Sequence, residues 1–285
     1  MKKVFLVVGL LVILTANAQM SGNNLPRFIR WVDNDQILVN TKLNKETTPK
    51  EYLYNTVTKQ YSPAPAATIP ATEKSVVVKN ANIYLKENGA EIQLTFDAAE
   101  EKTPILSPDG NYVGYTKNNN LYTLSLADKK EHAITSENTK GILNGYASWV
   151  YFEEIFGRPT QYRAFWWSPD SKYISFMRFD EREVPMFPIY NSEGQHGFIE
   201  ETRYPKAGDP NPTVKIGWTN PTGGAITWAD FNDQEDQYFG WPIWNPNNNS
   251  MWMSWMDRGQ NNLKIYELDM ATGAKKEVYK EYQIF

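Results

Sequence analysis

The stretch ILSPDGNYVGYTKNNNLYTLSL (residues 105–126) contains the unit that decides the fold. It begins with a Ser-Pro-Asp-Gly turn and continues as two alternating strands joined by an Asn-rich turn, which is the pattern of an antiparallel hairpin. The first part recurs at residues 166–179 as WWSPDSKYISFMRF, and the whole unit recurs at residues 243–279. A weaker copy covers residues 29–63, and residues 75–95 add another strand pair.

These repeats predict an all-β protein built from antiparallel sheets of about four short strands each. A sheet of this size cannot bury a core alone, so repeated copies favour the blades of a β-propeller, which stack around an axis. A large β-sandwich is the alternative, because it also has turn-separated strands. The aromatic-Ser/Asn-Pro turn at the same place in the repeats favours the propeller. The repeats are unevenly spaced, so we expect insertions, where functional residues usually lie.

The first residues, MKKVFLVVGLLVILTANAQ, have the layout of a secretory signal. Lys2 and Lys3 precede an apolar run from Val4 to Leu14, and small residues lead up to Ala18. The apolar run is about half of the roughly 20 residues that a membrane span needs. We therefore expect a signal peptide over residues 1–18, a mature chain without a membrane span, and a periplasmic or extracellular location.

The composition argues against several classes of function. Cysteine is absent, which rules out disulfides, thiol catalysis and Cys-ligated metals. The only two histidines, His132 and His196, lie far apart, so we expect no metal site and no other cofactor. The net charge is −4 and the charged residues are interspersed, so no basic stripe is available to bind nucleic acid.

The stretch WVYFEEIFGR (residues 149–158), in the first insertion, places Glu153 beside Glu154 among apolar neighbours. Like charges repel, and apolar surroundings raise the cost of each charge. In a strand the two side chains would point to opposite faces, whereas one helical turn would let both carboxylates contact one ligand. A primary ammonium fits such a pair best, because it brings three donors and a full charge. A surface pair at a blade rim is the alternative, and the pair alone favours that alternative.

The wider sequence resembles a known family. NGYASWVYFEEIFG (144–157), YRAFWWSPDSKYISFMRFDEREVP (162–185) and RYPKAGDPNPTVKI (203–216) are similar, in this order, to the propeller domain of dipeptidyl peptidase IV and its bacterial relatives. These are serine exopeptidases of the prolyl oligopeptidase group. The resemblance is continuous over about residues 105–220. It implies that residues 19–285 form about half of an eight-bladed propeller.

The resemblance also implies roles for individual residues. In this family a double-Glu motif on a short helix holds the free α-amino group of the peptide substrate, and that role falls on Glu153 and Glu154. A third Glu often precedes the pair, where this chain has Phe152. Phe156 matches a family aromatic near the pocket wall, with simple packing as the alternative. The family also supplies an Arg from earlier in the propeller, where residues 75–91 offer only lysines.

The family's catalytic residues have no counterpart in the sequence. The nucleophile of these peptidases lies in a Gly-x-Ser-x-Gly elbow of a C-terminal α/β-hydrolase domain, and no such motif occurs in the 285 residues. We therefore expect no catalytic residue here and no activity for this chain alone. The hydrolase domain would be its partner in cis. Dimers are common in the family, so a homodimer is also among the expected partners.

The expected function is thus that of the substrate-gating and amine-anchoring propeller of an exported serine dipeptidyl peptidase. Such an enzyme removes dipeptides, Xaa-Pro or Xaa-Ala, from peptides with a free N-terminus. The alternative is an exported propeller that acts as a binding module, or an inactive homologue of the peptidase.

Overall fold

The computed structural model describes residues 26–32, 35–43, 46–64, 74–245 and 250–283. The predicted signal peptide therefore lies outside the described residues. Contacts divide the chain into two compact units, residues 1–68 and 69–285, and each is described by itself. None of the helices in the described part is long and apolar enough to cross a membrane.

The first unit holds one four-stranded antiparallel sheet in the order β1-β2-β3-β4. Leu38 and Val39 are its buried apolar residues, and the rings of Tyr54 and Tyr61 pack 4.7 Å apart across β3 and β4. The strands are β1 (Arg27–Trp31), β2 (Gln36–Thr41), β3 (Lys50–Asn55) and β4 (Tyr61–Pro63).

The second unit begins with two sheets whose strands follow one another in sequence. Asn118 and Asn119 both have positive φ, as a two-residue hairpin turn between β9 and β10 requires. The first sheet comprises β5 (Ser75–Lys79), β6 (Asn82–Glu87) and β7 (Ala90–Gln93). The second comprises β8 (Glu101–Leu106), β9 (Tyr112–Lys117), β10 (Asn120–Ser125) and β11 (Glu131–Ala133).

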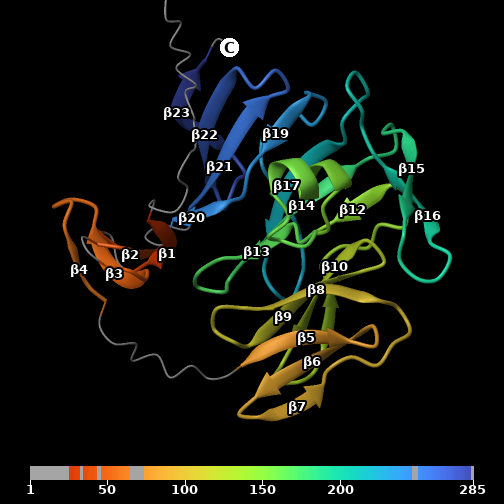
Figure 1. The fold of residues 1–285 in the computed structure, drawn as a ribbon, viewed down its shortest axis with the longest axis horizontal. Helices are drawn as coiled ribbons and strands as arrows, with labels where there is room; N and C mark the ends of the chain where they lie inside the picture. The colour runs from red at the N-terminus through yellow and green to blue at the C-terminus, as the bar shows by residue number, and fades with distance from the viewer. Residues whose placement is uncertain (1–25, 33–34, 44–45, 65–73, 246–249, 284–285) are drawn as a thin grey trace, which may run out of the picture. The chain divides into compact units, whose positions relative to one another are not determined.

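Two larger sheets and a hairpin complete the second unit (Figure 1). The third sheet comprises β12 (Ile142–Asn144), β13 (Phe165–Trp167), β14 (Ile174–Asp180), β17 (Thr213–Thr219) and β18 (Thr227–Trp228). The inserted hairpin is formed by β15 (Met186–Asn191) and β16 (Phe198–Arg203). The fourth sheet comprises β19 (Gln237–Phe239), β20 (Ile243–Asn245), β21 (Ser250–Asp257), β22 (Asn262–Asp269) and β23 (Lys275–Tyr282).

Each pair of consecutive sheets in the second unit encloses its own hydrophobic cluster. Ile83 of β6 packs in one cluster with Val113 of β9. Leu121 of β10 packs in the next with Phe165 of β13, and Met177 of β14 packs in the third with Met253 of β21. Sheets that are joined face to face in chain order, each with a separate core between neighbours, are the packing of propeller blades.

The predicted all-β fold is therefore confirmed, with sheets of three to five strands in place of a uniform four. Five such sheets occur in the described residues, one more than half of an eight-bladed propeller, so the blade count differs in detail from the prediction. The sandwich alternative is wrong, because two packed sheets would share one core.

Candidate functional site

The glutamate pair lies on a short π-helical turn, η1 (Tyr151–Ile155), between β12 and β13 (Figure 1). The backbone N–H of Phe156 donates to the carbonyl of Tyr151 at 2.7 Å, and the N–H of Arg158 donates to the carbonyl of Phe152 at 2.9 Å. Gly157 follows with φ of +65°, a conformation that ends helices because glycine adopts it freely. The predicted helical turn is thus confirmed.

Two aromatic residues fix this turn to the fold. Tyr151 is fully buried, and its hydroxyl accepts a 3.2 Å hydrogen bond from the backbone N–H of Phe239 in β19. Burial raises the pKa of Tyr151, which keeps the hydroxyl protonated. Trp149 packs its ring 4.1 Å from that of Tyr204, just after β16. The turn is therefore held by contacts on two sides, so the positions of the glutamates are set by the core.

The two carboxylates have different surroundings. Glu153 forms an ion pair with Arg158, and its side chain is 16% exposed. Glu154 is exposed and lines a cavity of about 320 Å³ together with Tyr238, Ser254 and Trp255, among others. Within the part of the chain that the structure describes, no ion pair or hydrogen bond involves the Glu154 carboxylate. Glu154 is consequently the carboxylate that is open to an incoming cation.

Helical geometry bears on whether the pair can contact one ligand. Successive residues are about 100° apart around the axis of an α-helix and less in a π-helical turn such as η1, compared with about 180° in a strand. A helical turn is thus compatible with the predicted joint contact, although Glu154 lines the cavity and Glu153 does not, and the shared ligand stays a prediction. A metal ion would need further ligands, and none of the other residues around the Glu154 cavity carries a carboxylate or an imidazole.

Phe156 lies in the core. It is 2% exposed and makes edge contacts with Tyr151 and Trp166 at ring-centroid distances of 5.6 and 5.7 Å. These contacts show that Phe156 packs in the hydrophobic core, which is the alternative that the sequence left open. Its predicted place near a pocket wall stays a prediction.

Residues for which the sequence predicted no role also surround the turn. The ring of Phe152 stacks on Tyr162 at 3.8 Å, and Tyr162 stacks on Tyr146 at 5.0 Å. Arg158 was visible in the quoted stretch, five residues after its partner Glu153, but neither local pattern nor spacing predicts that pairing. The aromatic stack joins η1 to the loop that leads to Arg163.

A second cluster of charges lies away from the turn. Asp97, Glu101 and Glu131 are the one group of carboxylates, among the described residues, close enough to hold a metal ion. The ammonium of Lys117 already lies 2.6 Å from Asp97 and 2.8 Å from Glu131. The cluster is accordingly an internal ionic network, with a lysine where a bound cation would be.

Comparison with known proteins agrees with these features. The sequence matches the family described as the dipeptidyl peptidase IV (DPP IV) N-terminal region over residues 98–283, and the chain belongs to this family. It is 41% identical over 122 residues to the "Probable dipeptidyl-aminopeptidase B" of Arthroderma gypseum, covering 39% of this chain and 13% of that protein. Its counterpart in Pyrenophora tritici-repentis is 28% identical over 191 residues, which is 62% of this chain and 21% of that one.

A solved structure shares the fold. The crystal structure of Porphyromonas gingivalis dipeptidyl peptidase 4 superposes with a TM-score of 0.63 at 20% identity, covering 90% of this chain and 40% of that one. The chain therefore spans less than half the length of the relatives that it matches.

Proposed function

We propose that this chain is the propeller part of an exported serine dipeptidyl peptidase, in which Glu153 and Glu154 hold the α-ammonium group of the substrate. The observation that carries the proposal is the helical turn η1, which presents an unpaired Glu154 carboxylate at a cavity. Membership of the dipeptidyl peptidase IV N-terminal family supports the same role.

The electrostatics of the pair suit an ammonium group. The guanidinium of Arg158 offsets the charge of Glu153, so the two carboxylates can lie on adjacent residues without strong mutual repulsion. One negative charge then remains for the ligand. An α-ammonium has a pKa of about 7.7–8.0 and is mostly charged at neutral pH. Each charge-assisted hydrogen bond to it would contribute about 1.5–3 kcal/mol.

An anchored amine also explains a fixed product length. If the ammonium group is held at a set distance from a nucleophile, the number of residues between the two is fixed, and the peptide is cut at one bond. The nucleophile would come from a hydrolase domain in cis. Whether that bond follows proline or alanine depends on contacts around the nucleophile.

The activity is tested on the full-length protein with peptides whose second residue is proline or alanine. Mass spectrometry should detect release of the N-terminal dipeptide from peptides with a free N-terminus and none from their N-acetylated forms. Loss of this activity after treatment with a serine-directed phosphonylating reagent would support the serine type. If the protein binds the free peptides and releases no product, the binding-module or inactive-homologue alternative holds.

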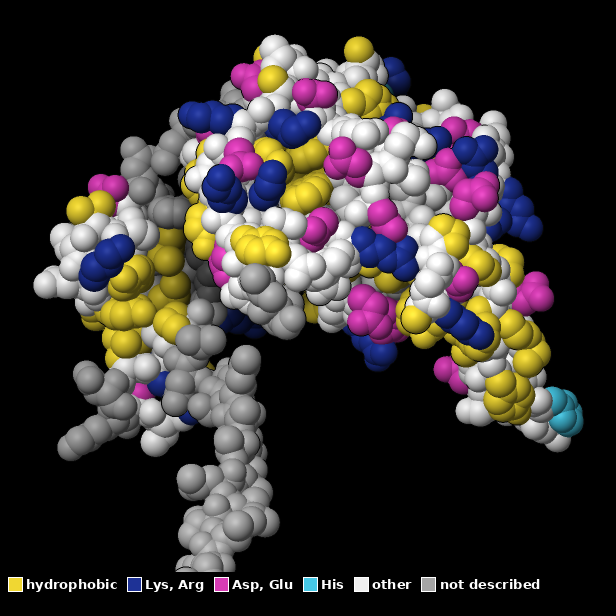
Figure 2. Space-filling view, turned by 90° about the horizontal axis from the view of Figure 1, so that it is seen from above, with side chains coloured by type: hydrophobic (Ala, Val, Ile, Leu, Met, Phe, Trp, Pro, Cys, Tyr) yellow, Lys and Arg dark blue, Asp and Glu magenta, His cyan; other side chains and the backbone are white. Residues whose placement is uncertain are grey.

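Export and self-association are part of the proposal. Secretion is tested by sequencing the mature N-terminus, which should begin at Gln19. The β15–β16 hairpin exposes Tyr190, Phe198 and Ile199, at 65%, 50% and 58%, and Figure 2 shows hydrophobic side chains gathered along it. Exposed apolar groups on one hairpin support a homodimer contact there.

A further inference from the structure

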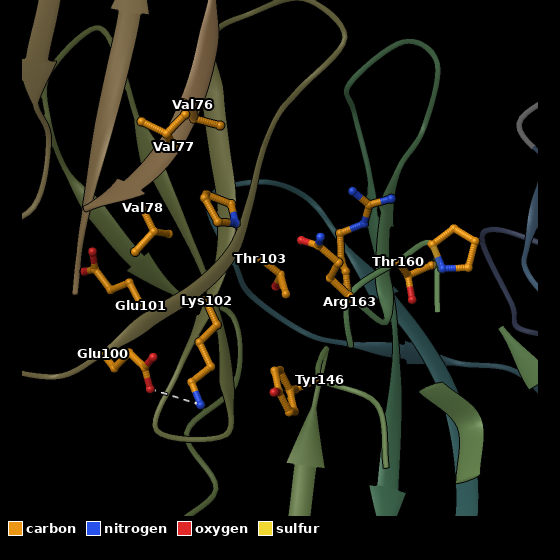
Figure 3. A pocket seen from close by; sticks show the side chains of 13 residues that line it. Val76, Val77, Val78, Glu100, Glu101, Lys102, Thr103, Tyr146, Thr160 and Arg163 are labelled. Carbon is orange, nitrogen blue, oxygen red and sulfur yellow. Dashed lines mark ion pairs between the residues drawn. The ribbon is translucent and has the colours of Figure 1, made fainter. Parts of the chain in front are cut away.

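A cavity in the second unit lies between the second sheet, its neighbouring first sheet and the loop after η1. It has a volume of about 600 Å³, within the range of small-molecule sites. Its walls come from adjacent edge strands β5 and β8 and from the loop that follows η1 (Figure 3). The side chains that line it include Glu100, Lys102, Thr103, Tyr146, Thr160 and Arg163.

Arg163 brings an unpaired charge to this cavity. Its Nε is buried and has no hydrogen-bond partner, and the rest of its guanidinium makes no ion pair or hydrogen bond within the described residues. Its position is set by the backbone, because its N–H donates to the carbonyl of Thr160 at 2.9 Å and it forms a β-bridge with Tyr146. Arg163 is half-buried, and partial burial without a partner lowers its pKa, since burial disfavours an unpaired charge.

Thr160 adds a second unsatisfied group. Its Oγ1 is buried and has no hydrogen-bond partner in the described structure, although the residue lines the same cavity only three positions before Arg163. Most buried polar atoms in proteins have a partner, so two exceptions on one wall indicate a bound group that completes them.

The opposite wall is strained. Thr103 has φ of +54°, a left-handed conformation that is unfavourable for a β-branched residue. The register of β8 against β9 shifts between Lys102 and Ile105, which marks a β-bulge at this point. Figure 3 shows Thr103 on the β8 side of the cavity, across from Arg163. Strain of this kind persists where the surrounding fold holds it, often at ligand sites.

The charges around the cavity limit the ligand. Lys102 pairs with Glu100 at 3.1 Å. The Glu101 carboxylate accepts hydrogen bonds from Thr95 and from the N–H of Ile83, away from Arg163. Arg163 is therefore the one charge in the lining without a partner. A carboxylate has one negative charge and two oxygens in a plane, which match the paired N–H donors of the Arg163 guanidinium. A phosphate with two negative charges would in addition be repelled by Glu100.

We propose that this cavity binds a carboxylate group of the peptide whose amine is held by Glu153 and Glu154, with Arg163 and Thr160 as donors. The identity of the ligand as a peptide rests on the proposed function. The two sites lie on either side of one aromatic stack, because Tyr146 lines the cavity and stacks through Tyr162 on Phe152, the neighbour of Glu153. The carboxylate is either the C-terminus of a short peptide or an acidic side chain.

The test is isothermal titration calorimetry of the full-length protein. The probe is Ala-Pro-(N-methyl-Ala)-Ala, in which the methyl group protects the bond after proline. Conversion of the probe's C-terminal carboxylate to an amide should raise Kd at least fivefold in the wild type. In Arg163→Gln the same conversion should raise Kd less than twofold. A second pair of probes, both amidated at the C-terminus, ends in Glu or in Gln. If an acidic side chain is the ligand, Kd should be at least fivefold lower for the Glu probe in the wild type and differ less than twofold in Arg163→Gln.

Controls separate this inference from the proposed function. Arg182 is an exposed arginine paired with Asp180, and Arg182→Gln should leave every Kd unchanged. Arg163→Gln should fold normally, because it removes a half-buried charge that has no partner, and Arg163→Lys should show an intermediate loss. N-acetylation of the probe tests the glutamate pair alone. The carboxylate site is wrong if neither the C-terminal carboxylate nor the Glu side chain of the probe affects Kd. It is also wrong if the effect of either group on Kd is the same in Arg163→Gln as in the wild type. Both outcomes would hold even when acetylation of the probe abolishes binding.

Discussion

The hydroxyl of Tyr151 accepts a hydrogen bond from the backbone N–H of Phe239, and this contact fixes the glutamate-bearing turn to the fourth sheet. Tyr151→Phe would leave a buried N–H without a partner, which costs about 1–3 kcal/mol. We expect the free energy of unfolding in urea to fall by that amount. Tyr279 is exposed on β23, so Tyr279→Phe should change it by less than about 0.5 kcal/mol. Equal effects of the two variants would show that the Tyr151 contact is not the anchor.

Glu181 predicts a pH dependence of stability. Burial raises the pKa of Glu181 to about 7 from an ordinary 4.5, although Arg203 lies 3.9 Å away and opposes the shift. Since the folded state holds this proton more tightly than the unfolded state, stability from this group falls as pH rises from about 4.5 to about 7. Glu181→Gln should therefore raise the free energy of unfolding at pH 8 by up to about 3 kcal/mol and change it little at pH 4.5.

Denaturation curves of this variant at the two pH values check the prediction. A gain of the same size at both would mean that Glu181 is not the titrating group. Glu193 is an exposed carboxylate on the β15–β16 turn and serves as the matched control, since Glu193→Gln should have no effect at either pH.

The Lys117 network predicts a stabilising role for its ammonium. Lys117→Met would remove the partner of Asp97 and Glu131 and leave the buried Glu101 beside two other carboxylates. Asp97 and Glu131 are partly exposed, so solvent screens part of the effect. We expect a loss of about 1–3 kcal/mol, with recovery in the double variant Lys117→Met/Glu131→Gln. Additive losses in the double variant would contradict a coupled network.

The hairpin predicts the oligomeric state. Ile199→Glu would place a charge on the exposed apolar surface of β16, and desolvation of that charge would oppose association. If the full-length protein is a dimer through this surface, light scattering should show a shift to monomer, while the far-UV circular dichroism spectrum, which reports the fold of each protomer, stays unchanged. Val57→Glu, at another exposed apolar residue, should leave the mass unchanged. A dimer that survives Ile199→Glu would place its interface elsewhere.

The repeated turns were the part of the fold that the sequence predicted best. In both copies the Ser hydroxyl donates to the Asp two positions later, Ser107 to Asp109 at 2.6 Å and Ser168 to Asp170 at 2.7 Å. Such contacts are local, so a short pattern determines them. The hairpins followed, because each turn joins two paired strands of one sheet, β8 to β9 and β13 to β14.

Long-range contacts at the site could not be predicted in this way. Trp149 meets Tyr204 across two insertions, and the Lys117 network depends on strand register and on the packing of sheets. Phe156 was equally compatible with a pocket wall and with the core, because an aromatic residue after a helical turn suits both. Thr103 and Arg163 are unremarkable in sequence, and only the backbone conformation and the missing partner distinguish them.

The central claim is that Glu154 and Glu153 recognise the substrate's α-ammonium group. The most direct measurement compares kcat/KM of the full-length enzyme for Ala-Pro-p-nitroanilide and for propionyl-Pro-p-nitroanilide, which lacks only the amine. Glu154→Gln should lower kcat/KM for the amine substrate at least tenfold and leave that for the propionyl substrate within twofold, whereas Glu193→Gln should change neither. An equal loss for both substrates, or no loss for either, would contradict the claim.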